Sequence, residues 1–180
     1  VFSSYKTIES EGGGVYIYKG DLYAWGKAGM GINGATLDNS IHSMVPSKYS
    51  LNNTLVPYAP EFVDVVYNSQ NIYAIDQNGY VWAAGKNTGR QLGETTVAAA
   101  TDITAPTLIP FFFNNNIKVK SIVIPVSSAG SISVAAITET GQLYVWGHNA
   151  NGQLGRGNTT TVTTPTLVTG LASTVKQVAM

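Results

Sequence analysis

A motif written three times in different spellings is the feature that most constrains how this chain folds. The copies read WGKAGMGING at 25–34, AGKNTGRQLG at 84–93 and WGHNANGQLG at 146–155. In each copy a glycine directly follows an apolar, aromatic-rich segment, and another glycine stands eight residues further on. Units that recur at a fixed period bury their cores against neighbouring units, so the repeat has to be recognised before single elements are assigned. The sequence therefore predicts a repeat protein.

A second set of similar segments gives the length of the repeat. TLVPYAPEFVDVV at 54–66 and TLVTGLASTVKQV at 166–178 align without a gap, and TLIPFFFNNNIKVKSIV at 107–123 aligns after a short insertion. This alignment places Val63, Val119 and Val175 at intervals of 56 residues. It predicts three units, 5–62, 63–118 and 119–174, with 175–180 beginning the next one.

The periodicity within a unit is that of β-strands. Apolar residues alternate over short runs that end at Gly, Asn, Asp or Pro, as in VAAITETGQLYVWG at 134–147. Asn78-Gly79 supplies the positive φ that a tight hairpin turn needs. No window of helical length carries an apolar stripe with a period of 3.6 residues, so we expect antiparallel sheets.

Small antiparallel sheets that recur in this way suit the blades of a β-propeller. The stretch GQLYVWGHNANGQLG at 141–155 resembles the repeats of the regulator of chromosome condensation family, which typically read GxLYxWGxNxxGQLG. The match is good at 79–93 and loose at 20–34. The resemblance implies an all-β fold, a seven-bladed β-propeller, of which these 180 residues would form an arc of roughly three blades. We expect further blades, from a longer chain or from other subunits, to complete the ring.

The motif residues have a structural interpretation. One glycine of each copy would end a strand at a sharp exit and the other would close the following turn, because both positions favour a residue without a side chain. Leu92 and Leu154 would fill the gap between blades, and the amides of Asn87 and Asn149 would hold the turn backbone. The positions assigned to architecture are Gly26, Gly34, Gly85, Asn87, Leu92, Gly93, Trp146, Gly147, Asn149, Gln153, Leu154 and Gly155.

Composition argues against several classes of function. The net charge is zero, with ten basic and ten acidic residues and no Lys/Arg cluster, so we expect no nucleic-acid partner. Apolar runs are too short to span a bilayer, so we expect no membrane insertion. Charged residues make up only 11%, cysteine is absent, and Thr, Asn and Ser together number 47. This composition favours an extracellular or virion surface protein, with a cytoplasmic or nuclear protein as the alternative.

We expect no enzyme. His42 and His148 are the only histidines, and no Cys or closely spaced carboxylate joins either of them, so neither a metal site nor a cofactor is predicted. No serine stands in a nucleophile elbow, and no catalytic residue is assigned.

The connectors after each motif differ most between the copies and are the candidate contact loops, at 35–53, 94–106 and 156–165. The longest mixes apolar, aromatic and basic groups at His42, Met44, Lys48 and Tyr49. Phe111, Phe112 and Phe113 form a second candidate, because three consecutive Phe cannot all point inward from a strand. The alternative is that these segments pack on their own blades.

These observations lead to two hypotheses of function. The first is a non-catalytic recognition or assembly module of an extracellular or virion protein, such as a phage tail component, that binds a protein or a cell-surface ligand. The second follows from the resemblance alone. It implies a regulatory propeller like the namesake of the family, a guanine-nucleotide exchange factor for a small GTPase.

Overall fold

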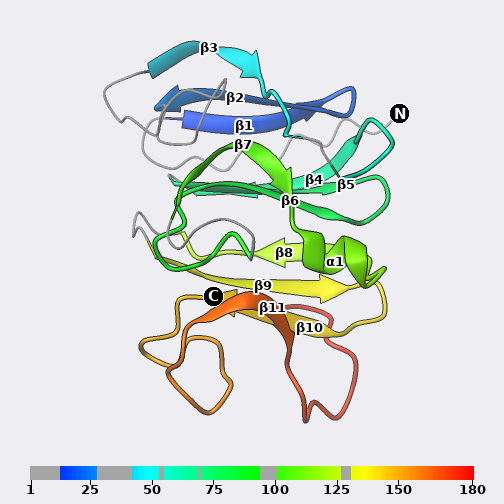
Figure 1. Cartoon of the computed structure of the whole chain (residues 1–180), viewed down its shortest axis with the longest axis vertical. Coiled ribbons are helices and arrows are strands. Elements are labelled where there is room, and N and C mark those ends of the chain that lie inside the picture. The colour runs from blue at the N-terminus through cyan, green and yellow to red at the C-terminus, as the bar shows by residue number, and fades with distance from the viewer. Residues whose placement is uncertain (1–12, 28–41, 53–54, 69, 94–100, 127–130) are drawn as a thin grey trace.

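Three antiparallel sheets are stacked along the long axis of the molecule (Figure 1). The computed structural model describes residues 13–27, 42–52, 55–68, 70–93, 101–126 and 131–180. The beginning of the first predicted unit, 5–12, and the motif residue Gly34 lie outside these ranges. The first sheet has the order β1–β2–β3, formed by β1 (Gly13–Tyr18), β2 (Asp21–Lys27) and β3 (His42–Lys48).

The second and third sheets are four-stranded meanders. The second sheet contains β4 (Phe62–Tyr67), β5 (Asn71–Asp76), β6 (Val81–Gly85) and β7 (Ile103–Leu108) in chain order. The third contains β8 (Val119–Val123), β9 (Ser133–Thr138), β10 (Leu143–Gly147) and β11 (Val162–Leu167) in the same arrangement. Three open, antiparallel sheets confirm the expected all-β fold, a partial propeller whose sheets do not close into a ring.

One short helix accompanies the strands. Residues Pro110–Asn114 form a short helix, α1, between β7 and β8, with proline in its first turn. Proline is favoured there because its fixed φ suits a helix and its missing N–H would have no partner in the helix anyway. No helix within the described ranges is long and apolar enough to cross a bilayer.

We call the place where the hairpin turn of one sheet contacts the chain segment that follows this sheet a joint. One backbone hydrogen bond recurs at every joint. The amides of Phe62, Val119 and Val175 donate to the carbonyls of Gly20, Gly79 and Gly141, each at 2.8 Å. Phe62, and not Val63, is therefore the counterpart of Val119 and Val175, which corrects the alignment by one residue. A bulge after Phe62 and another after Val119 each add an extra residue to the strand, so the matching of identical valines was misleading.

Aromatic side chains lock the joint between the second and third sheets. The indole N–H of Trp146 donates to the carbonyl of Gln91 at 2.6 Å, and the Tyr73 hydroxyl donates to the same oxygen at 2.7 Å. Trp146 also packs edge-on against Phe112 of α1, and both side chains are fully buried. The motif turn of the second sheet is thus wedged between two sheets, with Leu92 in the main core.

The predicted long connector 35–53 is partly a strand, which corrects the view of it as a loop. The end of β3 corresponds to the ends of β7 and β11. The residue directly after each of these strands donates its backbone amide to the preceding strand of the same sheet. These bonds join Tyr49 to Leu22 at 2.9 Å, Ile109 to Val81 at 2.8 Å and Val168 to Leu143 at 2.8 Å. The counterpart of the TLI segment at 107–109 is therefore 47–49, and not the TLV segment at 54–56.

Candidate interaction surface

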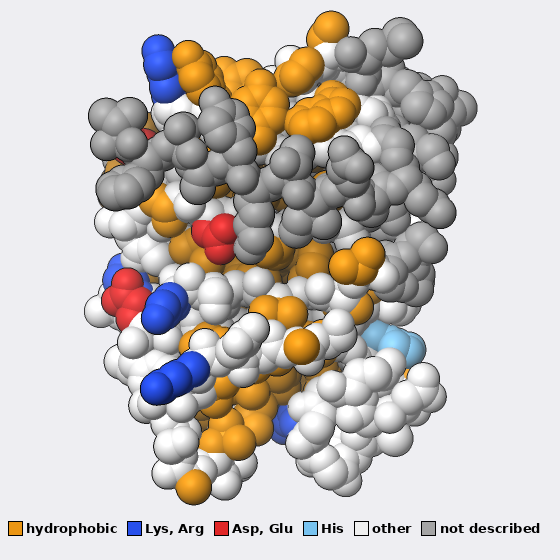
Figure 2. Space-filling view, turned by 180° about the vertical axis from the view of Figure 1, so that it is seen from behind, with side chains coloured by type: hydrophobic (Ala, Val, Ile, Leu, Met, Phe, Trp, Pro, Cys, Tyr) orange, Lys and Arg blue, Asp and Glu red, His pale blue; other side chains and the backbone are white. Residues whose placement is uncertain are grey.

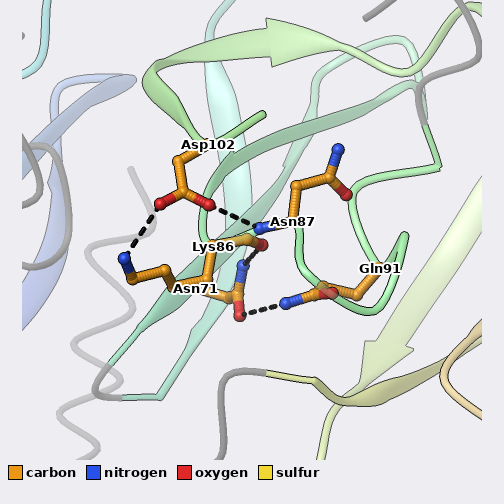
Figure 3. Close-up of polar contacts among 5 residues, drawn as sticks. All are labelled: Asn71, Lys86, Asn87, Gln91 and Asp102. Atoms are coloured by element: carbon orange, nitrogen blue, oxygen red, sulfur yellow. Dashed lines mark hydrogen bonds and ion pairs between the residues drawn. The ribbon is translucent and has the colours of Figure 1, made fainter. Parts of the chain in front are cut away.

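The exit of β6 carries a polar network that includes Asp102, the connector residue directly before β7 (Figure 3). The Asp102 carboxylate pairs with the Lys86 ammonium at 2.9 Å and accepts a hydrogen bond from the backbone amide of Asn87, also at 2.9 Å. The Asn71 side-chain amide donates to the carbonyl of Lys86 at 2.7 Å. Three segments far apart in the sequence are therefore tied together at one end of the second sheet.

Buried amides extend this network into the motif turn. Gln91 donates to the Asn71 side chain at 3.4 Å and accepts from the amide of Gly89 at 2.8 Å. Asn87 accepts from the amide of Leu92 at 3.1 Å. Because Asn71, Asn87 and Gln91 are fully buried, their hydrogen bonds fix the turn in a single conformation.

The third copy uses the same design with small changes. Asn149 accepts from the amide of Leu154 at 2.9 Å, and Gln153 accepts from the amide of Asn151 at 2.8 Å. Ser133 stands where Asn71 does and donates to the carbonyl of His148 at 2.7 Å. Both connectors therefore emerge from a rigid base at the same end of their sheets.

The exposed part of this network offers charged, hydrogen-bonding groups to solvent. The side chains of Lys86 and Asp102 are 33% and 29% exposed, so both reach solvent while they remain paired. Within the part of the chain that the structure describes, no group of three His, Cys, Asp or Glu residues is placed to hold a metal ion. The exposed groups can bind a partner, and they are not arranged as an acid–base pair around a cavity.

The predicted contact residues of the first connector separate into different environments. His42 and Met44 lie on the edge strand β3. Lys48 is exposed at the end of β3 and pairs with Asp21 at 2.7 Å, and this hydrogen bond raises the pKa of Lys48 above its usual value. Tyr49 is only 3% exposed, and burial raises the pKa of its hydroxyl. Tyr49 therefore packs in the core, and the binding role of the others remains a prediction.

The three phenylalanines form a helical turn and not an extended strand. Phe112 is fully buried, and Phe111 and Phe113 are half-buried beside Tyr144 and Tyr80, with ring centroids 5.7 and 5.1 Å apart. A helical turn points successive side chains in different directions, which lets one Phe enter the core while its neighbours cover the surface. The partly exposed pair remains a candidate contact.

Sequence reasoning missed Asn71, Lys86 and Asp102. The signal for Asn71 was available, since a polar residue begins the first strand of the hairpin in both complete sheets, Asn71 in β5 and Ser133 in β9. Nothing in the sequence pairs Lys86 with Asp102, because the two residues are 16 positions apart in a connector of irregular length.

Comparisons with known proteins agree with the repeat. Residues 140–180 match the regulator of chromosome condensation (RCC1) repeat. The chain is 30% identical over 151 residues to the human X-linked retinitis pigmentosa GTPase regulator, covering 81% of this chain and 12% of that protein. It is 34% identical over 98 residues to the human E3 ubiquitin-protein ligase HERC2, covering 54% of this chain and 2% of that protein.

Solved structures show the same fold. Human WBSCR16 superposes with a TM-score of 0.70 at 23% identity, over 93% of this chain and 40% of that one. Prp20p from Saccharomyces cerevisiae, studied for its binding to Gsp1p and histones, gives 0.69 at 19% identity, over 95% and 39%. The chain thus spans less than half of each of these structures and a small part of the two relatives. The resemblance that the motif indicated is confirmed.

Proposed function

Because residues 140–180 are a repeat of the regulator of chromosome condensation family and the resemblance extends along the chain, we propose that this segment belongs to a protein-binding, regulatory propeller. The observation that carries the proposal is the network of Asn71, Lys86, Asn87, Gln91 and Asp102. It ties Asp102, at the entry to β7, to the exit of β6, and scaffolds commonly present binding loops from such fixed points.

The relatives favour an intracellular regulatory role over a virion role. One is described as a GTPase regulator and another as a ubiquitin ligase, and neither description concerns a virion or a cell surface. The cytoplasmic or nuclear alternative therefore has the better support, and only the low-charge composition supports the extracellular or virion hypothesis. We propose a small GTPase as the first class of partner to test, with exchange of its guanine nucleotide as the regulated step.

A fluorescent-nucleotide release assay with small GTPases from the source organism tests the exchange role. If the proposal is right, the complete protein accelerates release, and the double variant Lys86→Gln, Asp102→Asn reduces the acceleration because it loosens the base of the connector. Lys19→Gln, at the opposite, hairpin-turn end of the first sheet, is the matched control. Release at the uncatalysed rate in the presence of the unaltered protein would exclude an exchange function for the GTPases tested.

Binding is measured separately from exchange. Calorimetry with the same GTPases distinguishes a propeller that binds without exchanging from one that does not bind them at all. Binding without acceleration would support the protein-interaction role and reject the exchange step, and absence of both would reject this partner class.

A further inference from the structure

Arg90 has a backbone conformation that arginine normally avoids. It lies in the motif turn of the second sheet with a φ of 61°, in the left-handed region where the Cβ of an ordinary residue is crowded. The other two copies of the motif carry glycine at this position, Gly31 and Gly152. Gly152 has a φ of 76°, so the turn calls for a left-handed residue, and glycine meets this need without strain. The second copy therefore holds a residue that lowers the stability of its turn.

The side chain of Arg90 is not needed to build the turn, because the third copy builds the same turn without it. The amide of Arg90 donates to the carbonyl of Asn87 at 2.9 Å, and the amide of Gly152 donates to the carbonyl of Asn149 at 3.0 Å. The side-chain amides of Asn87 and Gln91 have matching counterparts in the third turn, as described above. Arginine at position 90 therefore has no role in the hydrogen bonds that shape the turn.

The position of Arg90 is fixed by the residues on either side of it. Gly89 lies so close to Ser131 that an added Cβ would be 2.8 Å from the Cβ of this serine. The carbonyl of Gln91 accepts the hydrogen bond from Trp146. Both neighbours are buried against the third sheet, whereas Arg90 is only half-buried and reaches solvent. A partly exposed guanidinium thus stands on a rigid base.

No acid of the described ranges neutralises Arg90. The ion pairs there join Lys48 to Asp21 and Lys86 to Asp102. A guanidinium remains charged at any physiological pH and offers a planar fork of donors that matches a carboxylate. Arg90 therefore presents a cation with unused donors to solvent.

A second cation with a left-handed backbone, Lys19, has a contact that uses its charge. Lys19 has a φ of 51° in the two-residue turn that it forms with Gly20, and its ammonium lies 5.3 Å from the centre of the Tyr18 ring. Figure 2 shows basic side chains next to acidic ones along its left side, where the hairpin turns lie. A negatively charged ligand therefore meets both signs of charge at that end, and Lys19 is a matched control for Arg90.

We propose that Arg90 binds an acidic side chain of the protein partner. The inference rests on the proposed protein-binding function and names a contact residue for it, in the turn that Asn87 and Gln91 of the Figure 3 network hold. A guanidinium can donate two parallel hydrogen bonds to one carboxylate. Strained residues persist where the surrounding structure fixes them and where they have a function. Because the turn is already ordered, binding does not have to order its backbone.

The test is the binding of a short fluorescent peptide of alternating Glu and Gly to the complete protein, followed by anisotropy. Arg90→Gln should weaken binding about two- to fivefold, as is usual for partly exposed ion pairs. Arg90→Lys keeps the charge without the paired donors and should weaken binding less. Lys19→Gln removes the same charge from the opposite end of the sheets and should leave binding unchanged.

Three results of this experiment would overturn the proposal. They are binding that is insensitive to Arg90→Gln, an equal loss in Lys19→Gln, and no binding of the Glu peptide at all. A peptide with Gln in place of Glu should not bind, and equal binding of this peptide would reject the carboxylate as the ligand.

Stability distinguishes a binding residue from a structural one. Arg90→Gly should weaken peptide binding as much as Arg90→Gln does, yet raise the midpoint of urea unfolding, because glycine removes the strain of the left-handed backbone. Arg90→Gln keeps this strain and should leave the midpoint unchanged. A lower midpoint in both variants would show that the arginine side chain stabilises the turn, and it would overturn the proposal.

Gly152→Arg is the reverse control in the third copy. A Cβ added at Gly152 would have its nearest contact at 3.9 Å, the carbonyl oxygen of Asn158, so the side chain fits and only backbone strain is added. The midpoint of urea unfolding should therefore fall. An unchanged midpoint would show that a left-handed arginine is not strained in this turn, and it would remove the argument for a function of Arg90.

The GTPase experiments distinguish this inference from the proposed function. A GTPase that binds Arg90→Gln as tightly as it binds the unaltered protein would support the proposed function and reject this contact. Peptide binding that depends on Arg90, without binding of any GTPase, would support the contact and reject small GTPases as the partner class.

Discussion

Single residues decide the geometry wherever the backbone passes too close for a side chain. Gly147 has a φ of 94°, and a Cβ added there would lie 2.4 Å from the carbonyl oxygen of Ile132. Gly157 has a similar φ of 72° but open space around it. Substitutions at these two glycines therefore distinguish the strain of a left-handed backbone from the effect of a steric collision.

Gly147→Ala should destabilise the protein by about 2–4 kcal/mol, because the backbone of the third sheet has to move. Gly157→Ala should cost about 1 kcal/mol, the strain of the left-handed region alone. Urea unfolding followed by tryptophan fluorescence measures both. Equal costs for the two variants would show that the collision at Gly147 is relieved without loss of stability.

A buried carboxylate, Asp76, organises the second hairpin. It accepts hydrogen bonds from the hydroxyl of Tyr58 at 2.8 Å, the indole of Trp82 at 3.1 Å and the amides of Asn78 and Tyr80 at 2.9 and 3.0 Å. Four hydrogen-bond donors thus surround a carboxylate that is fully buried. Asp76 thus holds both the turn and the core beside it, and the hairpin pattern alone does not indicate the second role.

Asp76→Asn should cost about 1–3 kcal/mol, because an amide nitrogen would face a group that now donates to the carboxylate. Thr138 takes the place of Asp76 in the third sheet and uses its hydroxyl on the turn, so Thr138→Val is the comparison for a smaller loss. Thermal unfolding at neutral pH measures both variants, and a larger loss for Thr138→Val would contradict the central role of the carboxylate.

Alkaline pH should destabilise the fold through Tyr58. Burial, with the negative charge of Asp76 nearby, raises the pKa of Tyr58 to about 12 from the ordinary value of 10.0. The unfolded chain therefore loses this proton first, and stability is full below pH 10 and declines as the pH rises towards about 12. Tyr58→Phe should reduce the fall in the free energy of unfolding over this pH range, as measured by urea unfolding. If the variant shows the same fall as the unaltered protein, other tyrosines cause it.

At the scale of elements, tryptophan and the helical turn join two stacked sheets. Trp146 reaches from β10 to the carbonyl of Gln91, and Phe112 of α1 closes the space behind it. Because the Tyr73 hydroxyl donates to the same carbonyl, the joint has two donors to one oxygen. A variant of either donor therefore tests one bond without leaving the acceptor unpaired.

Trp146→Phe should cost about 1–3 kcal/mol from lost packing and one lost hydrogen bond, and Tyr73→Phe about 1 kcal/mol from the hydroxyl alone. The double variant should cost more than the sum, since the Gln91 carbonyl would then be buried without a donor. Chemical unfolding of the four proteins completes this double-mutant cycle, and strict additivity would show that the carbonyl finds another donor.

The motif was sufficient to predict hairpins, strand exits and stacked sheets, because glycine positions and strand alternation are local properties. It was not sufficient for β3, whose proline-containing segment at 46–49 matches 106–109 and 165–168 only weakly, or for the position of Phe62 at its joint. Bulges and side-chain pairs such as Lys86 with Asp102 depend on distant segments, and the repeat pattern does not encode them. The short helix depends on Phe112 finding a place beside Trp146, which is a property of the packed molecule.

At the scale of the whole molecule, each sheet is stabilised mainly by its neighbours. The strands β5 and β6 of the second sheet and β9 of the third are buried along their whole length, whereas β11 is mostly half-buried and the segment after it is largely exposed. Exposure of this kind lowers the free energy of local opening. Amide hydrogen exchange should therefore be slowest in β5, β6 and β9 and fastest after β11, and uniform protection would contradict this order.

The recurring hydrogen bond from Phe62, Val119 and Val175 to the preceding turn glycine has a consequence for how such chains arise. Each sheet offers the acceptor at its hairpin turn, and the donor stands in the chain segment that follows this sheet, so successive units are joined in the same way. A duplication or deletion of one whole unit in the gene would leave every remaining contact of this type intact. The number of units can therefore change during evolution in single steps. The unequal connectors can diversify independently, as can the residues that lie over the turn glycines, Glu61, Lys118 and Thr174.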